Sequence, residues 1–299
     1  MKSKVKMFRE LLDSKSIVKV CGAFDAMSAK LVEKFGFDAV WSGSFAISAI
    51  NAVPDASILT MTEFFDAAEK MTNACKIPVI ADCDTGYGGP SNVRHMVKKY
   101  ESAGIAGISI EDKIFPKQNS LLRSSSHQLL SEKDFVGKII TANEAKQDPD
   151  FMIIARVEAL IAGLGMQEAL NRASAYEKAG ADAILIHSKK NTPNEIFEFV
   201  DSWEGNLPII VIPTTYNSVN IDDLIKHKIK VVIYANQTLR AAHASMSRLL
   251  KELINKKSID KVNEEISSMD EIFQLQEMYD LKTQEKELEE KFKKMGYNS

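Results

Sequence analysis

One pattern of polar and hydrophobic positions recurs along the chain. A polar helical stretch ends at a glycine, a short apolar run follows, and a polar residue closes the run. Clear copies cover Lys34–Ser42, Tyr100–Asp112 and Tyr176–Ser188. In each copy the glycine suits the end of a helix, where a left-handed backbone is favourable. The apolar run that follows is typical of a strand buried on both faces, as in a parallel sheet.

Further apolar runs bring the predicted strands to eight. The additional strands cover residues 17–21, 79–81, 151–155, 209–212 and 231–234. Helical patterns lie between the strands, including residues 61–73, 92–103, 166–179, 195–203 and 237–253. Regular alternation of strands and helices implies a parallel sheet, and eight strands is the number that closes a barrel. We therefore predict a (β/α)8 barrel, with a doubly wound open sheet as the alternative.

The chain after residue 255 is rich in charged residues. Ile272, Leu275, Met278 and Tyr279 form an apolar stripe at helical spacing within it. This pattern predicts a C-terminal helical extension over about 256–299 that packs either on the outside of the barrel or on a neighbouring subunit. Because no low-complexity linker interrupts the sequence, we expect a single domain over residues 1–299.

Charge and composition exclude several classes of protein. The formal net charge of the 299 residues is -3, so no basic excess supports nucleic-acid binding. The basic N-terminal segment lacks a continuous apolar run, so we interpret it as a short amphipathic helix and not as a signal peptide. No apolar run is long enough to span a membrane. The three cysteines show no C-x-x-C pairing, which fits a reducing compartment, and we expect a cytoplasmic protein.

Polar residues gather where the predicted strands end. The active site of such a barrel lies at the carboxyl ends of its strands, so these residues are predicted to share one rim. They are Trp41, Ser42, Asp82, Asp84, Glu111, Asp112, Lys113, Arg156, Glu158, His187 and Asn236. This concentration of carboxylates, cations and one histidine predicts a functional site.

The carboxylates at this rim suggest a metal site. Strand alternation places Asp82 and Asp84 on one side of the chain and Cys83 on the other. With Glu111 from the next strand, they form a hard, oxygen-rich set that suits Mg²⁺. The alternative is a pair of aspartates that cap a loop. We interpret Cys83 as a buried, inert thiol.

A long irregular segment, about residues 113–130, follows the fourth predicted strand. A long loop at the active rim of a barrel is usually a lid. Lys117, Asn119 and Ser120 could reach a bound anion when such a lid closes, whereas the alternative is an exposed surface loop. Arg156 offers a planar fork for carboxylate or phosphoryl oxygens. His187 shares the rim with Arg156, which favours a functional role over a structural one.

Several motifs resemble those of the phosphoenolpyruvate mutase/isocitrate lyase superfamily, over nearly the whole chain. The most specific is E-D-K, five residues, then N-S, present here as Glu111-Asp-Lys113 and Asn119-Ser120. The others are Gly22–Asp25, Ala52–Asp55, Asp82–Gly88, Arg156–Gly163 and Ala183–Ser188. The resemblance is greatest to the branch that contains the mutases and the phosphonopyruvate hydrolases.

This resemblance implies a fold, a cofactor and a reaction. The fold would be a (β/α)8 barrel whose last helix is swapped onto a partner, giving a homotetramer arranged as a dimer of dimers. Mg²⁺ would be held directly by Asp82, and through water by Asp84 and Glu111. The substrates would be phosphoenolpyruvate and 3-phosphonopyruvate, which the enzyme would interconvert. A phosphonopyruvate decarboxylase would remove the product, because the reaction toward phosphonopyruvate is expected to be uphill.

The resemblance also implies roles for individual residues. Lys117, Asn119 and Ser120 would belong to a lid that keeps the site dry. Arg156 and His187 would steady the migrating phosphoryl group. Backbone amides near Gly43, Ser44 and Phe45 would hold the substrate carboxylate beside Trp41. Asp55 would lie near the phosphoryl group and the waters of the metal.

The sequence departs from the relatives in two loops. Ser44 stands where the relatives usually place glycine. After Asn119-Ser120 the chain continues as Leu121–Ser126, in place of the usual D-G or G-E step. Both departures fall on segments that are expected to contact the substrate or to move over it.

Three other functions remain open at this point. Phosphonopyruvate hydrolase is the nearest, and it resembles a version of the lid with threonine in place of Asn119. A lyase that cleaves a C–C bond in a methylmalate-like or isocitrate-like acid is a second reading. Isocitrate-cleaving relatives carry a lid cysteine, however, and no cysteine follows Cys83 here. The third is a barrel that binds a small dianion without turnover.

Overall fold

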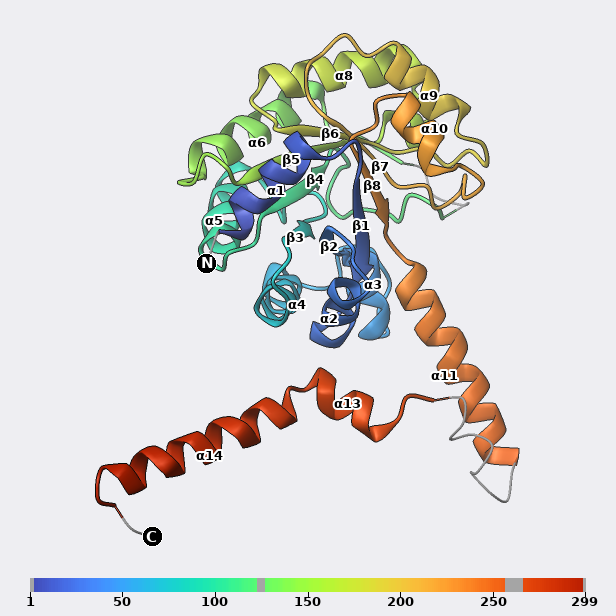
Figure 1. Ribbon diagram of the computed structural model, residues 1–299. Coiled ribbons are helices and arrows are strands. Elements are labelled where there is room, and N and C mark those ends of the chain that lie inside the picture. The colour runs from blue at the N-terminus through green and yellow to red at the C-terminus, as the bar shows by residue number, and fades with distance from the viewer. Residues whose placement is uncertain (1–2, 123–126, 256–265, 298–299) are drawn as a thin grey trace. The chain divides into compact units, whose positions relative to one another are not determined.

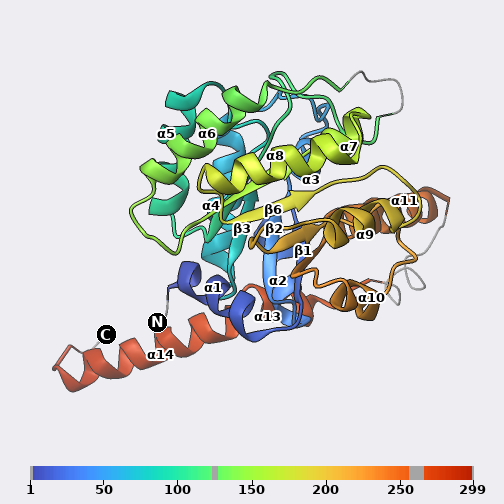
Figure 2. The same cartoon turned by 90° about the horizontal axis from the view of Figure 1, so that it is seen from above.

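The computed structural model describes residues 3–122, 127–255 and 266–297. Eight parallel strands form a closed barrel in which each strand pairs with the next along the chain and β8 pairs with β1 (Figures 1 and 2). The strands are β1 Val18–Ala23, β2 Ala39–Ser42, β3 Val79–Asp82, β4 Gly107–Glu111, β5 Met152–Val157, β6 Ala183–Ile186, β7 Ile209–Val211 and β8 Val231–Tyr234. The closed barrel is confirmed, and the open sheet is excluded.

Helices lie between the strands along the chain and cover the outside of the barrel (Figure 2). Those up to the last strand are α1 Lys4–Ser14, α2 Ala26–Lys34, α3 Ser44–Ile50, α4 Met61–Ala74, α5 Pro90–Ser102, α6 Glu132–Ala145, α7 Ala159–Ala162, α8 Met166–Lys178, α9 Asn194–Asp201 and α10 Ile221–Lys226. After the last strand come α11 Gln237–Asn255, α13 Met269–Leu275 and α14 Met278–Lys294. The predicted strands and helices match these bounds to within about two residues at most ends.

Alternation along the strands sorts side chains between two apolar layers. In β5, Met152 and Ile154 pack inside the barrel, whereas Ile153 and Ala155 pack against the surrounding helices. The same period of two carries the inward positions to the carboxyl ends of the strands. There the apolar series gives way to Asp82, Glu111, Arg156 and His187. The strand pattern therefore places these polar side chains together inside the rim of the barrel.

Helix α1 closes the opposite end of the barrel. Phe8 and Leu12 join the interior apolar cluster. Arg9 Nε donates to the carbonyl of Asp150, just before β5, and Arg9 Nη2 lies 2.6 Å from Asp182 Oδ1, just before β6. Because this amino-terminal end is filled by side chains, the carboxyl ends of the strands form the open face of the barrel.

The chain divides into two compact units, Met1–Arg240 and Ala241–Ser299. Within the second unit, the predicted apolar stripe falls on α13 and the start of α14. Residues 256–265 of the predicted extension lie outside the described residues. Both the single domain over 1–299 and the helix swap stay predictions. Among the residues that the structure describes, every helix is too short or too polar to span a bilayer.

A close backbone approach at the rim leaves no space for a side chain at Gly22. A Cβ atom at this position would lie 2.1 Å from the carbonyl oxygen of Ala235. We predict that Gly22→Ala lowers the free energy of unfolding by about 1–3 kcal/mol, because the backbone of one strand end must move. Chemical denaturation monitored by circular dichroism measures this.

Gly137→Ala is the matched control, because a Cβ atom there would meet nothing within 4 Å. Gly137 lies inside α6, where alanine is favoured over glycine by about 0.5–1 kcal/mol. The two substitutions should therefore change stability in opposite directions. Equal and small effects from both would contradict the tight approach at Gly22.

Candidate active site

A cavity of about 360 Å³ opens at the carboxyl ends of the strands. It brings together nearly all the residues that the sequence predicted for the site: Trp41, Gly43, Ser44, Phe45, Asp55, Asp82, Glu111, Lys117, Asn119, Ser120, Arg156 and His187. Asp84 is buried just behind the lining, in contact with Lys117. Asn236 and Lys113, predicted at the rim without a defined role, also line the cavity.

Lys117 joins the lid to the barrel. Its ammonium lies 2.6 Å from Asp84 Oδ1 and 2.8 Å from Asp55 Oδ1. It also donates to the hydroxyl of Ser44, which in turn donates to Asp82 Oδ2 at 3.1 Å. Burial alone would lower the pKa of Lys117, but the surrounding carboxylates raise that pKa well above its ordinary value. Lys117 is therefore a permanent cation in the site.

The lid is seated on the segment that carries Asp55. Asn119 Nδ2 donates to Asp55 Oδ2 at 2.7 Å, and the backbone N–H of Lys117 donates to the hydroxyl of Ser57 at 3.1 Å. Both ends of the lid are also paired, since Ile114 N–H donates to the carbonyl of Gln128. The predicted loop over 113–130 therefore packs over the cavity, while its residues 123–126 lie outside the described residues.

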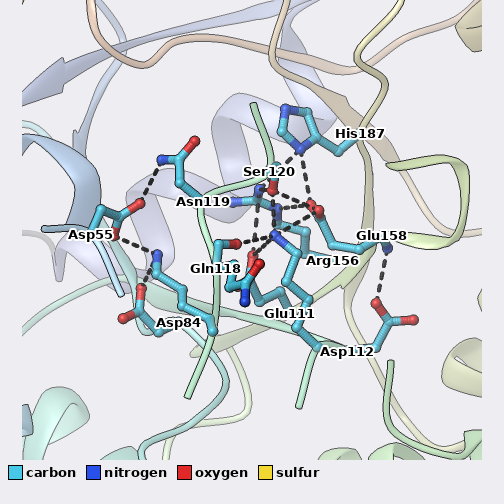
Figure 3. Close-up of polar contacts among 12 residues, drawn as sticks. Asp55, Asp84, Glu111, Asp112, Gln118, Asn119, Ser120, Arg156, Glu158 and His187 are labelled. Atoms are coloured by element: carbon cyan, nitrogen blue, oxygen red, sulfur yellow. Dashed lines mark hydrogen bonds and ion pairs between the residues drawn. The ribbon is translucent and has the colours of Figure 1, made fainter. Parts of the chain in front are cut away.

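A second group of charges surrounds Glu158, whose side chain is fully buried. Glu158 Oε1 accepts a hydrogen bond from Arg156 Nε at 2.6 Å, and Oε2 accepts one from the hydroxyl of Ser120 at 2.7 Å. Lys113 Nζ lies 3.1 Å from Oε2. Burial opposes ionisation of Glu158, but the nearby cations hold its pKa well below the ordinary value. Figure 3 shows this carboxylate between the lid and the barrel.

His187 contacts both members of the Arg156–Glu158 pair. Its Nδ1 lies 2.9 Å from Arg156 Nη2 and 2.9 Å from Glu158 Oε1. A guanidinium can only donate and a carboxylate can only accept, so the proton on Nδ1 decides which partner His187 bonds. Burial lowers the pKa of His187, which favours the neutral ring. The histidine can therefore hold or release a proton at Nε2, depending on its tautomer.

Asp112 departs from the expectation that it belongs to the charged rim of the site. Its carboxylate points away from the cavity and accepts hydrogen bonds from the hydroxyl of Tyr176 at 2.7 Å and from the backbone N–H of Glu158 at 2.9 Å. Arg172 Nη1 lies 3.1 Å from the same carboxylate. Burial raises the pKa of Asp112 to about 6. Alternation explains the direction, because the preceding residue, Glu111, points inward.

Cys83 also points away from the cavity, as the alternation predicts. It is fully buried in the outer apolar layer and carries a free thiol. Burial raises the pKa of Cys83 well above its ordinary value, so the thiol stays protonated. This agrees with the interpretation of an inert core residue.

The carboxylates predicted to hold a metal are not gathered into a ready-made cage. Among the described residues, no three Asp, Glu, His or Cys side chains converge closely enough to hold a metal ion by themselves. Cations stand between them instead: Arg156 Nη2 lies 3.4 Å from Glu111 Oε2, and Lys117 holds Asp84.

The chemistry of the set nevertheless suits a hard divalent cation. Glu111 Oε1 and Asp84 Oδ2 are buried carboxylate oxygens with no hydrogen-bond partner. Five carboxylates face three buried cations here, which leaves an excess of two negative charges among the buried groups when all of them are ionised, and the exposed Arg240 lines the same cavity. The carboxylates are Asp55, Asp82, Asp84, Glu111 and Glu158, and the cations are Lys113, Lys117 and Arg156. Burial raises the pKa of Asp84 to about 7, against the charge of Lys117. A bound Mg²⁺ would relieve this repulsion.

Comparisons with known proteins point to one family. A sequence profile of the family described as phosphoenolpyruvate phosphomutase matches residues 8–254. The chain is 42% identical to a phosphonopyruvate hydrolase of Variovorax sp. (strain Pal2) over 275 residues, which are 92% of this chain and 95% of the hydrolase. It is 40% identical to a phosphoenolpyruvate phosphomutase of Tetrahymena pyriformis over 283 residues, which are 95% of this chain and 94% of that protein.

The solved structures that match the chain include enzymes with the same two activities. A phosphoenolpyruvate phosphomutase from Streptomyces platensis subsp. rosaceus matches with a TM-score of 0.93 and 43% identity, covering 95% of this chain and 98% of that one. A phosphonopyruvate hydrolase in complex with oxalate and Mg²⁺ matches with a TM-score of 0.89 and 41% identity, covering 94% of this chain and 98% of that one. In the sequence comparison, a 2,3-dimethylmalate lyase and an oxaloacetate decarboxylase match shorter parts of the chain, 60% and 72% of it.

The support behind the site can be tested at Tyr176. We predict that Tyr176→Phe lowers the free energy of unfolding by about 1–3 kcal/mol, because it removes a hydrogen bond to the buried carboxylate of Asp112. Denaturant unfolding of the purified variant measures the change.

Tyr216→Phe is the control, since the buried hydroxyl of Tyr216 has no hydrogen-bond partner in the structure. Its removal should be neutral or slightly stabilising, because no bond is broken. If both variants lost the same stability, the hydrogen bond to Asp112 would not be the cause.

Proposed function

The chain belongs to the phosphoenolpyruvate phosphomutase family, and from this membership we propose that it interconverts phosphoenolpyruvate and 3-phosphonopyruvate. In this reaction the phosphoryl group leaves the enol oxygen and bonds to carbon 3 of the same pyruvyl unit. The observation that carries the proposal is the hydrogen bond between Asn119 of the lid and Asp55 of the rim. Phosphonopyruvate hydrolase is the second candidate, favoured by the 42% identity to such an enzyme.

The cationic and polar groups of the cavity suit a substrate that carries both a carboxylate and a phosphoryl group. The amides of Gly43, Ser44 and Phe45 lie at the start of helix α3, where backbone N–H groups lack partners within the helix. They would bind the carboxylate beside the indole ring of Trp41. Arg156 and His187 would hold the phosphoryl oxygens as the group migrates, since hydrogen-bond donors fixed in advance stabilise developing charge.

Asp82, Asp84 and Glu111 would hold Mg²⁺, an ion that the solved structure of the related hydrolase contains. When bound, the ion supplies positive charge to the enolate oxygen of the pyruvyl group. The excess of negative charge in the cavity supports this assignment, because a substrate anion would otherwise enter a repulsive site. Lys117 and Arg156 then balance the charges of the two carboxylates that do not hold the ion, Asp55 and Glu158. The substrate oxygens would thus not face an unbalanced negative charge.

The lid would decide whether the phosphoryl group returns to substrate or reaches water. Phosphoryl transfer passes through a loose, metaphosphate-like state, which water captures readily. Lys117 and Asn119 both bond Asp55, and these contacts hold the lid over the cavity. In this proposal Asn119 bars water from the migrating group, and the seated lid favours rearrangement over hydrolysis.

The biological setting belongs to the same proposal. A homotetramer with exchanged C-terminal helices, action in the cytoplasm and a role in phosphonate biosynthesis follow the family resemblance. An enzyme that consumes phosphonopyruvate, such as a decarboxylase, would draw an unfavourable equilibrium forward. Size-exclusion chromatography with light scattering tests the tetramer independently of activity.

Phosphorus NMR of the purified protein with phosphonopyruvate and Mg²⁺ tests the reaction. We expect the phosphoenolpyruvate signal to grow, its growth to stop with excess EDTA, and its growth to resume when Mg²⁺ is restored. Binding of Mn²⁺, followed by electron paramagnetic resonance, should weaken in Asp82→Asn. Growth of inorganic phosphate alone would establish the hydrolase, and an unchanged spectrum would leave lyase or non-catalytic functions.

The role of Asn119 predicts a change in product ratio. Asn119→Thr shortens the side chain, removes the amide that bonds Asp55 and should let water reach the phosphoryl group. We expect the ratio of phosphate to phosphoenolpyruvate to rise about tenfold, the effect of losing one hydrogen bond to a charged group. Phosphorus NMR measures both products in one sample.

Asn171→Thr is the matched control, because Asn171 lies on α8 and bonds the exposed side chain of Gln167. It should leave the product ratio unchanged. An Asn119→Thr enzyme with the parent ratio would show that this residue does not exclude water.

A further inference from the structure

We propose that Glu158 is a positioning residue that couples closure of the lid to the placement of Arg156 and His187. The inference rests on the proposed function and adds to it a residue to which the family resemblance gave no role. It follows from how one buried carboxylate divides its hydrogen bonds between the lid and the barrel (Figure 3).

The hydroxyl of Ser120 marks the lid side of this connection. It donates to Glu158 Oε2 at 2.7 Å, and it accepts from Arg156 Nη2 at 3.0 Å and from Lys113 Nζ. A serine hydroxyl has one proton to donate and two lone pairs to accept with, so these three contacts use its full capacity. In the closed lid Ser120 therefore bonds the protein itself, and we assign it to latching the lid and not to binding substrate.

The barrel side of the connection uses the other oxygen of the same carboxylate. Glu158 Oε1 lies 2.6 Å from Arg156 Nε and 2.9 Å from His187 Nδ1. These are the two groups that would hold the phosphoryl oxygens. Because a carboxylate is planar and rigid, the orientation that receives the Ser120 hydroxyl also sets the position of Oε1. Closure of the lid thereby fixes the direction in which Arg156 and His187 point.

The backbone of Glu158 is held from behind. Asp112 Oδ1 accepts the N–H of Glu158 at 2.9 Å, and Asp112 Oδ2 is bonded by the hydroxyl of Tyr176 and by Arg172. Asp112 directly follows β4, and Tyr176 and Arg172 lie on α8, so these groups are outside the lid. The carboxylate of Glu158 therefore has a fixed base, against which the lid can open and close.

Lys113 completes the network at the start of the lid. It lies 3.1 Å from Glu158 Oε2 and donates to the carbonyl of Gln118 at 3.0 Å. A glutamine at position 158 would present an N–H₂ group either toward Ser120 and Lys113 or toward Arg156 and His187. In each orientation one half of the network loses its acceptor.

The first test measures how the phosphoryl group partitions between phosphoenolpyruvate and phosphate. We expect Glu158→Gln and Ser120→Ala each to raise the ratio of phosphate to phosphoenolpyruvate about tenfold. The ratio is independent of the amount of active enzyme, so a merely structural loss would lower both products and leave it unchanged. Glu144→Gln is the control, because Glu144 forms an exposed pair with Arg94 at 2.9 Å.

The second test does not depend on the reaction. Trypsin cleaves after Lys117 only when the lid opens, since Lys117 is buried in the closed lid. Cleavage then follows the population of the open state. We expect each single variant to be cut about tenfold faster than the parent, and the double variant Ser120→Ala/Glu158→Gln to be cut at nearly the same rate as either single one. The shared hydrogen bond can be lost only once.

The outcomes separate this proposal from the proposed function. Additive effects, near one hundredfold in the double variant, or parent-like cleavage of both single variants would overturn the coupling. A parent enzyme that yields neither product contradicts the proposed function. The trypsin cycle, which is the comparison of cleavage rates among the parent, the two single variants and the double variant, still tests whether Ser120 and Glu158 are coupled. If the parent yields only phosphate, the product ratio is saturated and the trypsin cycle decides alone. If Glu158→Gln does not fold, Ser120→Ala alone is tested. A product ratio and a cleavage rate equal to those of the parent would then overturn the proposal.

Discussion

The cost of burying charge governs this active site. Moving carboxylates and ammonium groups out of water is expensive unless each finds a partner of opposite sign. Here the acidic groups come from the barrel and from the segment around Asp55, while Lys117 comes from the lid. The barrel rim and the lid are therefore electrostatically dependent on each other. If the lid opens as proposed, Lys117 would leave Asp84, and closure would restore the pair in a site shielded from water.

This dependence explains how one scaffold can serve different reactions. Mutases and hydrolases of about 40% identity share the barrel, and their proposed chemistries differ in whether water meets the phosphoryl group. In the proposed function, water access is set by a few lid contacts, such as those of Asn119 and Ser120, so a small change there would have a large effect on the products. The charges that would bind metal and substrate lie on the strands or directly after them, outside the lid.

The fold and the direction of the site residues were predictable because both follow from periodicity. Eight apolar runs separated by helical patterns predicted the closed barrel, and a period of two predicted that Asp82 and Asp84 lie opposite Cys83. The same rule, applied one residue beyond Glu111, would have corrected the prediction that Asp112 belongs to the charged rim, because it places Asp112 outside the cavity.

Pairing between distant segments was not predictable in this way. The central place of Glu158 depends on Ser120 and Lys113 reaching it from the lid, and no local pattern specifies where an irregular loop packs. The only sequence signal was the spacing of Arg156 and Glu158 around a strand end. The sequence likewise did not show that Lys117 and Arg156 lie between the carboxylates. The predicted metal ligands are therefore less closely gathered than the ligands of a preformed metal site.

Oxygen isotope labelling tests most directly whether the closed lid keeps the phosphoryl group from water. Phosphonopyruvate is converted in water enriched in oxygen-18, and the phosphoryl oxygens of every product are analysed by mass spectrometry. The account predicts phosphoenolpyruvate whose phosphoryl group carries no solvent oxygen. Inorganic phosphate with one oxygen-18 atom as the main product would contradict it, because the phosphoryl group would then have been transferred to water.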